Sequence, residues 1–425
     1  MSLTYRQSTL IRGSLPMLRA QGETITSSFY ASLLRAHPEL HNIFNSANQA
    51  TGRQPRALLN IILAFAAAPN HTAELIPRLE RVCQKHCSLG ITPDQYDLLG
   101  KYLLRSFGEI LGDRYTAELR EAWEKAYSLL ARMLIGREVQ LYRQFGKWAG
   151  QRIFRIEDKV AEVDDIYSFY LWPVDKTPLP LFTPGQYVSV RVDVPQIGYL
   201  QSRQYSLSEA PNEEYYRISV KRDRGVPSGA NGRSVDAAHL KPGLVSNLLI
   251  NDYNIGDTLS VSHPAGGFGF DSSTAGGMGP LVFLSAGVGA TPLMSILNSV
   301  LESPDVQQQI SWIHCSRRKP LFEDHIRTVG RRHKNFHSRF WRSMLAEQEQ
   351  RETHNPERDG VFESVRTELE RVERSVLGLD HGAAEYFICG PDAFAASVRN
   401  FLLEQGVGEL RIRCEWFSTG ELEAS

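Results

Sequence analysis

The sequence predicts three domains: an all-α domain, then an antiparallel β-barrel, then an α/β domain with a parallel sheet. Two observations support this. A chain of 425 residues exceeds what one hydrophobic core normally serves. Helical periodicity dominates the first third of the chain, and short runs of alternating apolar and polar residues dominate the middle third. In the last third, apolar strands alternate with helical patterns. We place the domains at residues 1–148, 149–273 and 274–425.

The composition is that of a globular protein without a dominant charge. There are 47 basic and 48 acidic residues, so no global electrostatic field recruits nucleic acid. Five scattered cysteines, an odd number without a secretory leader, favour reduced thiols in the cytoplasm. The longest apolar run, 57–69, is shorter than the roughly 20 residues that span a bilayer. We therefore expect neither a nucleic-acid partner nor stable membrane insertion.

The first 22 residues contain three arginines and no acidic residue, a pattern that also occurs in organelle transit peptides. Mitochondrial targeting is therefore a minor alternative to the cytoplasm. The same stretch contains Leu10, Leu15 and Leu18, which are typical of an ordinary first helix.

One histidine of the helical domain, His86, lies on an apolar stripe. The stripe consists of Leu79, Val82, His86 and Leu89, at intervals of three and four residues. The imidazole should therefore face the core, where a polar ring without a partner is costly. From the residues alone, a metal ligand and a hydrogen-bonded core histidine are equally good interpretations. A metal site shared with Cys83 and Cys87 is disfavoured, because no second ligand group lies nearby.

Two further polar residues should point inward. Tyr96 begins an apolar stripe that continues at 99, 103 and 107, and Glu138 continues the stripe of 127, 130 and 134. An inward carboxylate needs a donor, and a metal-ligating histidine presents one on its second ring nitrogen. We therefore expect His86, Tyr96 and Glu138 to form one network.

Tyr30 and Gln54 are candidates for the opposite side of such a metal. Tyr30 lies beside the stripe of Phe29, and Gln54 precedes Leu58 by one helical turn. Either side chain could offer a hydrogen bond to a ligand of the metal. Alternatively, each is simply a polar residue at a helix edge.

A second set of candidate residues lies in the predicted barrel. Arg203, Gln204, Tyr205 and Ser206 follow a strand-like run. An arginine can pair with a flavin pyrophosphate, a tyrosine can stack on the isoalloxazine ring, and a serine hydroxyl can reach its edge. A surface strand explains the segment equally well.

A third set lies in the predicted α/β domain. Gly287, Gly289, Thr291 and Pro292 follow a buried strand, and we expect a helix to begin at the proline. Glycines let backbone amides approach a phosphate. Later strands are followed by two further groups, namely Cys389, Gly390 and Pro391, and then Glu415 and Phe417.

In order and spacing, the helical region resembles the globin domain of flavohaemoglobins. The resemblance rests on Phe29, Tyr30, Asn42, Phe44, Asn48, Gln54, Leu58, Gln84, Lys85, His86, Gln95 and Tyr96. It implies that His86 is the proximal ligand of a haem b iron, supported by Tyr96 and Glu138. It also implies that Tyr30, Gln54 and Leu58 line the distal pocket and that Phe44 wedges against the haem.

The rest of the chain resembles the ferredoxin reductase family. FAD contacts are implied for Tyr187, Arg203, Gln204, Tyr205, Ser206, Val220, Lys221, Gly243, Val245 and Ser246. The glycine loop and strand ends of the third domain are then expected to hold NADPH or NADH, with Phe417 covering the flavin until the nucleotide displaces it. Gly267, where the family commonly has aspartate, and the tail after Phe417 depart from the pattern.

The second strand of the nucleotide domain runs into Ser316, Arg317 and Arg318, where a strict NAD site often has an acid. We therefore predict that NADPH is accepted at least as well as NADH.

By these resemblances, the chain is expected to be a monomeric nitric oxide dioxygenase. Electrons from NAD(P)H would pass through FAD to haem, and nitric oxide and O2 would become nitrate. One alternative is an oxygen or nitric oxide sensor or store with a maintenance reductase. Another is a flavin diaphorase or ferric reductase.

Overall fold

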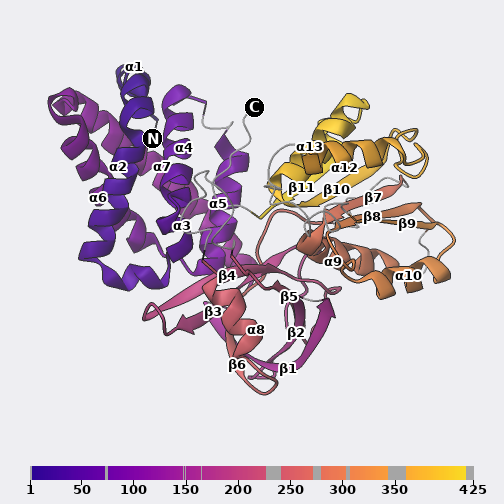
Figure 1. Ribbon diagram of the computed structural model, residues 1–425. Helices are drawn as coiled ribbons and strands as arrows, with labels where there is room; N and C mark the ends of the chain where they lie inside the picture. Colours follow the sequence, from indigo (N-terminus) through magenta and orange to yellow (C-terminus); the bar gives the residue numbers. More distant parts are fainter. Residues whose placement is uncertain are drawn as a thin grey trace.

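The computed structural model describes residues 2–71, 75–146, 148, 150–163, 165–225, 241–270, 279–302, 307–342 and 360–417. Within these residues the chain forms a helical part, a six-stranded antiparallel sheet and a five-stranded parallel sheet flanked by helices (Figure 1). The predicted fold class is confirmed. No helix in the described ranges is long and apolar enough to cross a membrane.

The helical part contains seven α-helices and two 3₁₀ turns among the described residues. They are α1 (Tyr5–Gly13), α2 (Leu15–Ala36), η1 (Pro38–Asn42), α3 (Ser46–Ala50), α4 (Arg53–Ala67), α5 (Ile76–Leu89), α6 (Pro93–Leu111), η3 (Gly112–Arg114) and α7 (Ala117–Gln144). Capping boxes at Thr4 and Thr92 begin α1 and α6, and Gly90, at φ 77°, ends α5. The expected single first helix is in fact two, because the chain ends α1 at Gly13 and begins α2 with Pro16 in its first turn.

Small residues let these helices cross closely. A Cβ on Gly22 of α2 would lie 2.2 Å from a methyl group of Leu59 on α4. A Cβ on Gly100 of α6 would lie 2.3 Å from the ring of Tyr127 on α7. The core between the helices includes the buried residues Phe29, Phe65, Phe107 and Trp123.

The antiparallel sheet closes into a barrel. Its order is β4-β3-β6-β1-β2-β5, and the two end strands meet at the bridge between Leu207 and Ile218. The elements are β1 (Gln151–Val163), β2 (Ile166–Pro173), β3 (Tyr187–Val194), β4 (Tyr199–Ser206), β5 (Tyr216–Lys221), β6 (Thr258–Ser262) and helix α8 (Leu244–Asn251). Arg203–Ser206 thus form the end of β4, whereas the sequence pattern placed them after a strand.

The parallel sheet has the order β11-β10-β7-β8-β9. Its strands are β7 (Leu281–Ala286), β8 (Ile310–Ser316), β9 (Phe336–Arg342), β10 (Glu385–Gly390) and β11 (Ile412–Trp416). Helices α9 (Ala290–Leu301) and α10 (Glu323–Arg332) cover one face, and α12 (Gly360–Glu370) and α13 (Asp392–Glu404) the other. Short 3₁₀ turns, η4 (Gly287–Gly289) and η5 (Glu409–Arg411), precede α9 and β11.

Two expected boundaries in this part are wrong. Helix α9 begins at Ala290, because the chain already turns helically after Gly289, so Pro292 lies inside the first turn. In the sequence, apolar and basic residues alternate from Leu410 onward, which predicts that the last strand begins there, but β11 pairs only from Ile412. Leu410 lies in η5 and is 98% exposed.

Candidate active site

Three polar side chains from three helices meet at His86. Its Nδ1 lies 2.8 Å from the Tyr96 hydroxyl and 2.9 Å from Glu138 Oε1. The Tyr96 hydroxyl donates to the same carboxylate oxygen at 2.5 Å. Tyr96 and Glu138 are buried, whereas 30% of the His86 side chain is exposed. The structure therefore brings together the network expected from the helical stripes.

Glu138 determines which ring nitrogen of His86 carries the proton. A carboxylate only accepts hydrogen bonds, so Nδ1 is the protonated nitrogen and Nε2 keeps its lone pair. Burial, together with the hydrogen bond to Glu138, raises the pKa of Tyr96 far above its usual range, so the phenol remains a donor. Within the described part of the chain, Nε2 has no hydrogen-bond partner. A neutral imidazole backed by a carboxylate is a suitable axial ligand for haem iron, so these residues fit a haem.

Tyr30 and its neighbours form the second part of this region. Tyr30 on α2 is buried, and burial raises the pKa of its phenol, while a hydrogen bond with the Gln54 side chain of α4 offsets part of that rise. The Tyr30 and Phe44 rings meet edge to face with centroids 5.5 Å apart. Phe44 and Leu58 are only partly buried against the same core. Tyr30 is thus a protonated hydrogen-bond donor among apolar side chains.

The end of β4 presents a half-buried cation, Arg203. The pairing of β3 with β4 places Tyr187 opposite Ser206, and Val190 opposite Arg203. Burial lowers the pKa of Arg203, whose guanidinium contacts the Ser202 carbonyl at 2.9 Å and Gln201 Oε1 at 3.5 Å. Among the described residues, no carboxylate pairs with Arg203. A desolvated guanidinium without an acidic partner fits an anionic phosphate.

The other residues expected to contact FAD differ in where they lie: some are near the end of β4, and others are in the barrel core. Burial raises the pKa of Tyr187 and Tyr205, so both phenols remain neutral. Gly243 begins α8 and packs so closely on Asp223 that a Cβ would lie 2.8 Å from its side chain. Ser246 Oγ accepts the Asp223 amide at 3.3 Å, which brings α8 beside the end of β5 and its Lys221. Of the remaining candidates, Val220 and Val245 have side chains that lie in the barrel core, which distinguishes them from Gln204.

The glycine loop of the α/β part lies beside the end of β10. A Cβ on Gly289 would lie 2.2 Å from the Cys389 carbonyl oxygen, and one on Gly390 3.1 Å from the Cβ of Ala286. Gly287 adopts φ 55°. Thr291 Oγ1 donates to the Val288 carbonyl at 2.9 Å, so this buried side chain stabilises the loop. The close backbones at the start of α9 fit a phosphate group.

The end of β11 completes this edge. Glu415 and Trp416 pair with Cys389 and Gly390 of β10, and Phe417, which follows, is 46% exposed. Burial raises the pKa of Glu415 to about 7, and the nearby Arg81 guanidinium opposes that rise. Pro391 lies directly after β10, where it begins the turn into α13.

Two parts of the chain match known protein families. Residues 27–134 match the globin family, and residues 283–400 match the oxidoreductase NAD-binding domain. The chain is 38% identical over 421 residues to a flavohemoprotein of Rhizobium meliloti, covering 98% of both chains. It is also 38% identical over 418 residues to a flavohemoprotein of Bordetella parapertussis, covering 97% of both.

The chain belongs to the flavohemoprotein family.

A solved structure agrees with this assignment. A flavohemoglobin from Malassezia yamatoensis, determined with bound FAD and heme, superposes with a TM-score of 0.76 at 26% identity. The match covers 98% of this chain and 100% of that one. The order of parts in this flavohemoprotein is therefore the order found in that structure.

Sequence reasoning missed the residues that join the flavohemoprotein's three parts. On α5, burial lowers the pKa of Lys85 to about 8, with Arg81 and Arg203 adding to the effect. Arg81 also donates to the Trp416 carbonyl of β11. Thus one helix contacts both the barrel and the terminal strand. The only signal in the sequence was two basic residues near His86, which is also typical of a solvated helix face.

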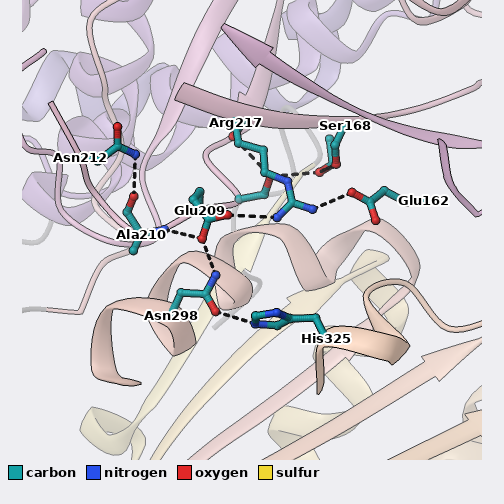
Figure 2. A network of polar contacts seen from close by, with 10 residues as sticks. Glu162, Ser168, Glu209, Ala210, Asn212, Arg217, Asn298 and His325 are labelled. Atoms are coloured by element: carbon teal, nitrogen blue, oxygen red, sulfur yellow. Dashed lines mark hydrogen bonds and ion pairs between the residues drawn. The ribbon is translucent and has the colours of Figure 1, made fainter. Parts of the chain in front are cut away.

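A second missed cluster lies between the barrel and the α/β part (Figure 2). Arg217 of β5 pairs with Glu162 at 2.6 Å and with Glu209 at 3.3 Å. Glu209 accepts the Asn298 amide of α9 at 2.5 Å, and Asn298 Oδ1 accepts from His325 Nε2 of α10 at 2.9 Å. The Arg217 guanidinium also lies 4.8 Å from the centre of the Phe322 ring. Nothing local in the sequence distinguishes Arg217 from other charged strand residues.

Proposed function

We propose that the chain is a nitric oxide dioxygenase that uses haem b, FAD and NADPH or NADH to convert nitric oxide and O2 to nitrate. The observation that carries this proposal is the position of His86. Its Nδ1 is held by Glu138 and Tyr96, and its own helix reaches both the barrel and the nucleotide part. Membership of the flavohemoprotein family supports the same conclusion.

When bound, the nicotinamide and the flavin would supply hydride and single-electron chemistry, and haem iron would supply the binding and reduction of oxygen. The residues of the protein hold and orient the cofactors and their ligands. Glu138 keeps the proton on Nδ1 of His86, so that the Nε2 lone pair would be available to hold a haem iron. Tyr30, with Gln54 beside it and Phe44 packed on its ring, would supply a neutral O–H donor for a polar ligand.

In the reductase half, Arg203 would pair with the flavin phosphates, and Tyr187, Tyr205 and Ser206 would pack on the ring system. The backbone at Gly287 and Gly289 would hold the nucleotide phosphates beside Cys389 and Gly390. Phe417, which is partly exposed after β11, would cover the flavin ring until the nucleotide binds.

We also propose that NADPH is used at least as well as NADH. Arg317 and Arg318 follow β8. Desolvation lowers the pKa of Lys221 of the barrel, and the Arg317 guanidinium adds to this effect. Basic groups here favour a ribose phosphate over a bare hydroxyl. The ratio of kcat/KM for the two nucleotides tests this, and a strong preference for NADH would contradict it.

Finally, we propose a cytoplasmic monomer with domain limits near 148 and 273. Among the described residues, none of the five cysteines forms a disulfide. The helical part ends with α7 at Gln144 and the parallel sheet begins at Leu281, although Phe268 and Phe270 already pack in the core of the α/β part. Limited proteolysis would locate the limits, and sedimentation would determine the oligomeric state.

The substitution Tyr30→Phe tests the distal role. It removes one hydroxyl and keeps the ring that packs on Phe44. We expect nitric oxide consumption to fall about 10-fold or more, which corresponds to losing roughly 1.4 kcal/mol from one hydrogen bond. Reduction of the flavin by NADPH should stay unchanged. Equal nitric oxide turnover in the variant would remove Tyr30 from the mechanism.

A further inference from the structure

Gln201 of the barrel lies against the globin segment that contains Phe44. The side chain is on β4, two residues before Arg203, and is only 1% exposed. Its Oε1 accepts both the backbone amide and the hydroxyl of Ser46, each at 3.0 Å. Its Nε2 donates to the carbonyls of His41 at 2.9 Å and Phe44 at 3.4 Å. One barrel side chain therefore holds the backbone on both sides of Phe44.

The same carboxamide also touches the proposed flavin site. Arg203 Nη1 lies 3.5 Å from Gln201 Oε1. The contacts favour one orientation of the carboxamide, because its oxygen faces the Ser46 backbone amide and the Arg203 guanidinium, which only donate. Its nitrogen faces only carbonyl oxygens, including that of Leu200 at 2.9 Å. A rotated amide would oppose like groups at all of these contacts, and only the Ser46 hydroxyl could adapt to it.

Two neighbouring contacts keep this part of β4 on the globin segment. The Leu200 amide donates to Asn42 Oδ1 at 2.8 Å. The ring of Tyr199 stacks on that of His41 with centroids 4.7 Å apart. These contacts hold the strand against the segment 41–46.

We propose that Gln201 is a positioning residue that couples the two cofactor sites, so that haem and FAD each strengthen the binding of the other. The inference rests on the proposed roles of Phe44 at the haem and Arg203 at the flavin. A haem packed on Phe44 orders the backbone of 41–46. This in turn fixes the carboxamide that contacts the Arg203 guanidinium. A phosphate bound by Arg203 orders the same contact from the other side, and linkage makes the two effects equal.

Other contacts between globin and barrel use neither Gln201 nor Arg203. The Ser189 hydroxyl donates to Ser88 at 2.8 Å, and the Gly266 amide donates to Gln84 Oε1 at 2.9 Å. These contacts are on the α5 side, and they reach the proposed flavin residue Gln204, which donates to Ser189 at 3.0 Å. The Gln201 contact shares no residue with them, so substitutions can test it separately.

The test measures the dissociation constant of FAD for the full-length chain, by quenching of flavin fluorescence, with and without haem. We expect haem to tighten FAD binding about 5-fold or more in the wild type, the lower end of typical coupling. In Gln201→Leu the ratio should fall to about one. Ser46→Ala removes one of the two donors to Oε1 and should lower the ratio partly, which keeps the test valid if Gln201→Leu does not fold.

Gln309→Leu is the matched control. Gln309 donates to the Ser375 carbonyl at 2.8 Å within the α/β part and contacts neither site, so the wild-type ratio should persist. A wild-type ratio of about one, or an unchanged ratio in both Gln201→Leu and Ser46→Ala, would overturn the inference while leaving the proposed function intact. A wild-type chain that binds no FAD in either form would contradict the proposed function itself, and the inference with it.

Discussion

The barrel holds its two neighbours by different chemistry. Toward the globin part, most contacts are made by uncharged amides and hydroxyls, such as Gln84, Ser88 and Gln201. Toward the α/β part, the central group is the Arg217 guanidinium, which pairs with two carboxylates (Figure 2). It also lies over the Phe322 ring. The first contact is a set of separate hydrogen bonds, whereas the second is one charged network.

The difference has an energetic consequence. Each uncharged hydrogen bond stabilises by about 1 kcal/mol, and losing one leaves the others in place. A buried charge is costly without all of its partners, so the Arg217 network forms completely or not at all. We infer that the network defines one position of the nucleotide part on the barrel, and that the globin contact tolerates small adjustments.

The largest effect is expected at Arg217. Arg217→Met leaves Glu162 and Glu209 without their cation, and only 15% and 25% of these side chains are exposed. We expect β5 to lose about 3–4 kcal/mol of local stability, as for a broken buried ion pair. Hydrogen exchange of the β5 amides measures this.

The matched control is Arg105→Met, which breaks an exposed pair with Glu109 on α6. Its effect on stability should be small, because solvent screens an exposed ion pair. If the two variants lose similar stability, the Arg217 network is no more cooperative than a surface pair, and the comparison fails.

A smaller effect is expected from pH at the globin contact. His263 is 1% exposed and stacks on Phe145 at 4.0 Å, and burial lowers its pKa below 6.5. Below pH 6.5 the unfolded chain therefore binds a proton that the folded chain does not, and stability falls as the pH falls. The slope is at most about 1.4 kcal/mol per pH unit.

His263→Phe keeps the stacking and removes the titrating group. The pH dependence of the free energy of unfolding in urea, between pH 7.5 and 5.5, should become flatter in this variant. An unchanged slope would mean that His263 does not contribute to the acid sensitivity of this interface.

The smallest effect is expected at Ser88. The Ser189 hydroxyl donates to Ser88 Oγ, and Gln204 Nε2 donates to Ser189 at 3.0 Å. Ser88→Ala should cost about 1 kcal/mol, because the remaining hydrogen bonds persist. Hydrogen exchange of α5 and β3 measures the change. A loss as large as that of Arg217→Met would show that the uncharged contact is also cooperative.

Much of the fold and of the haem region follows from local pattern. His86, Tyr96 and Glu138 lie on apolar stripes, and helical spacing suffices to point them inward. The starts of α9 and β11 were misplaced, because the sequence pattern put them at Pro292 and Leu410 rather than at Ala290 and Ile412. Boundaries of this kind depend on backbone hydrogen bonds rather than on residue type.

No local sequence pattern predicted the contacts between the three parts. Gln201 meets Ser46 from 155 positions away, and Asn298 meets Glu209 from 89 positions away. A glutamine on a strand or an asparagine on a helix is typical of solvent exposure. Only the packing of the three parts decides that these side chains are enclosed.

The most direct test of the proposed function is the amount of nitrate formed per nucleotide oxidised, with nitric oxide in air and the haem- and FAD-loaded protein. Each nucleotide supplies two electrons, and each nitric oxide converted consumes one together with one O2. We predict two nitrates per nucleotide. Nucleotide oxidation without nitrate would contradict the dioxygenase assignment, although the cofactors would still be correctly assigned.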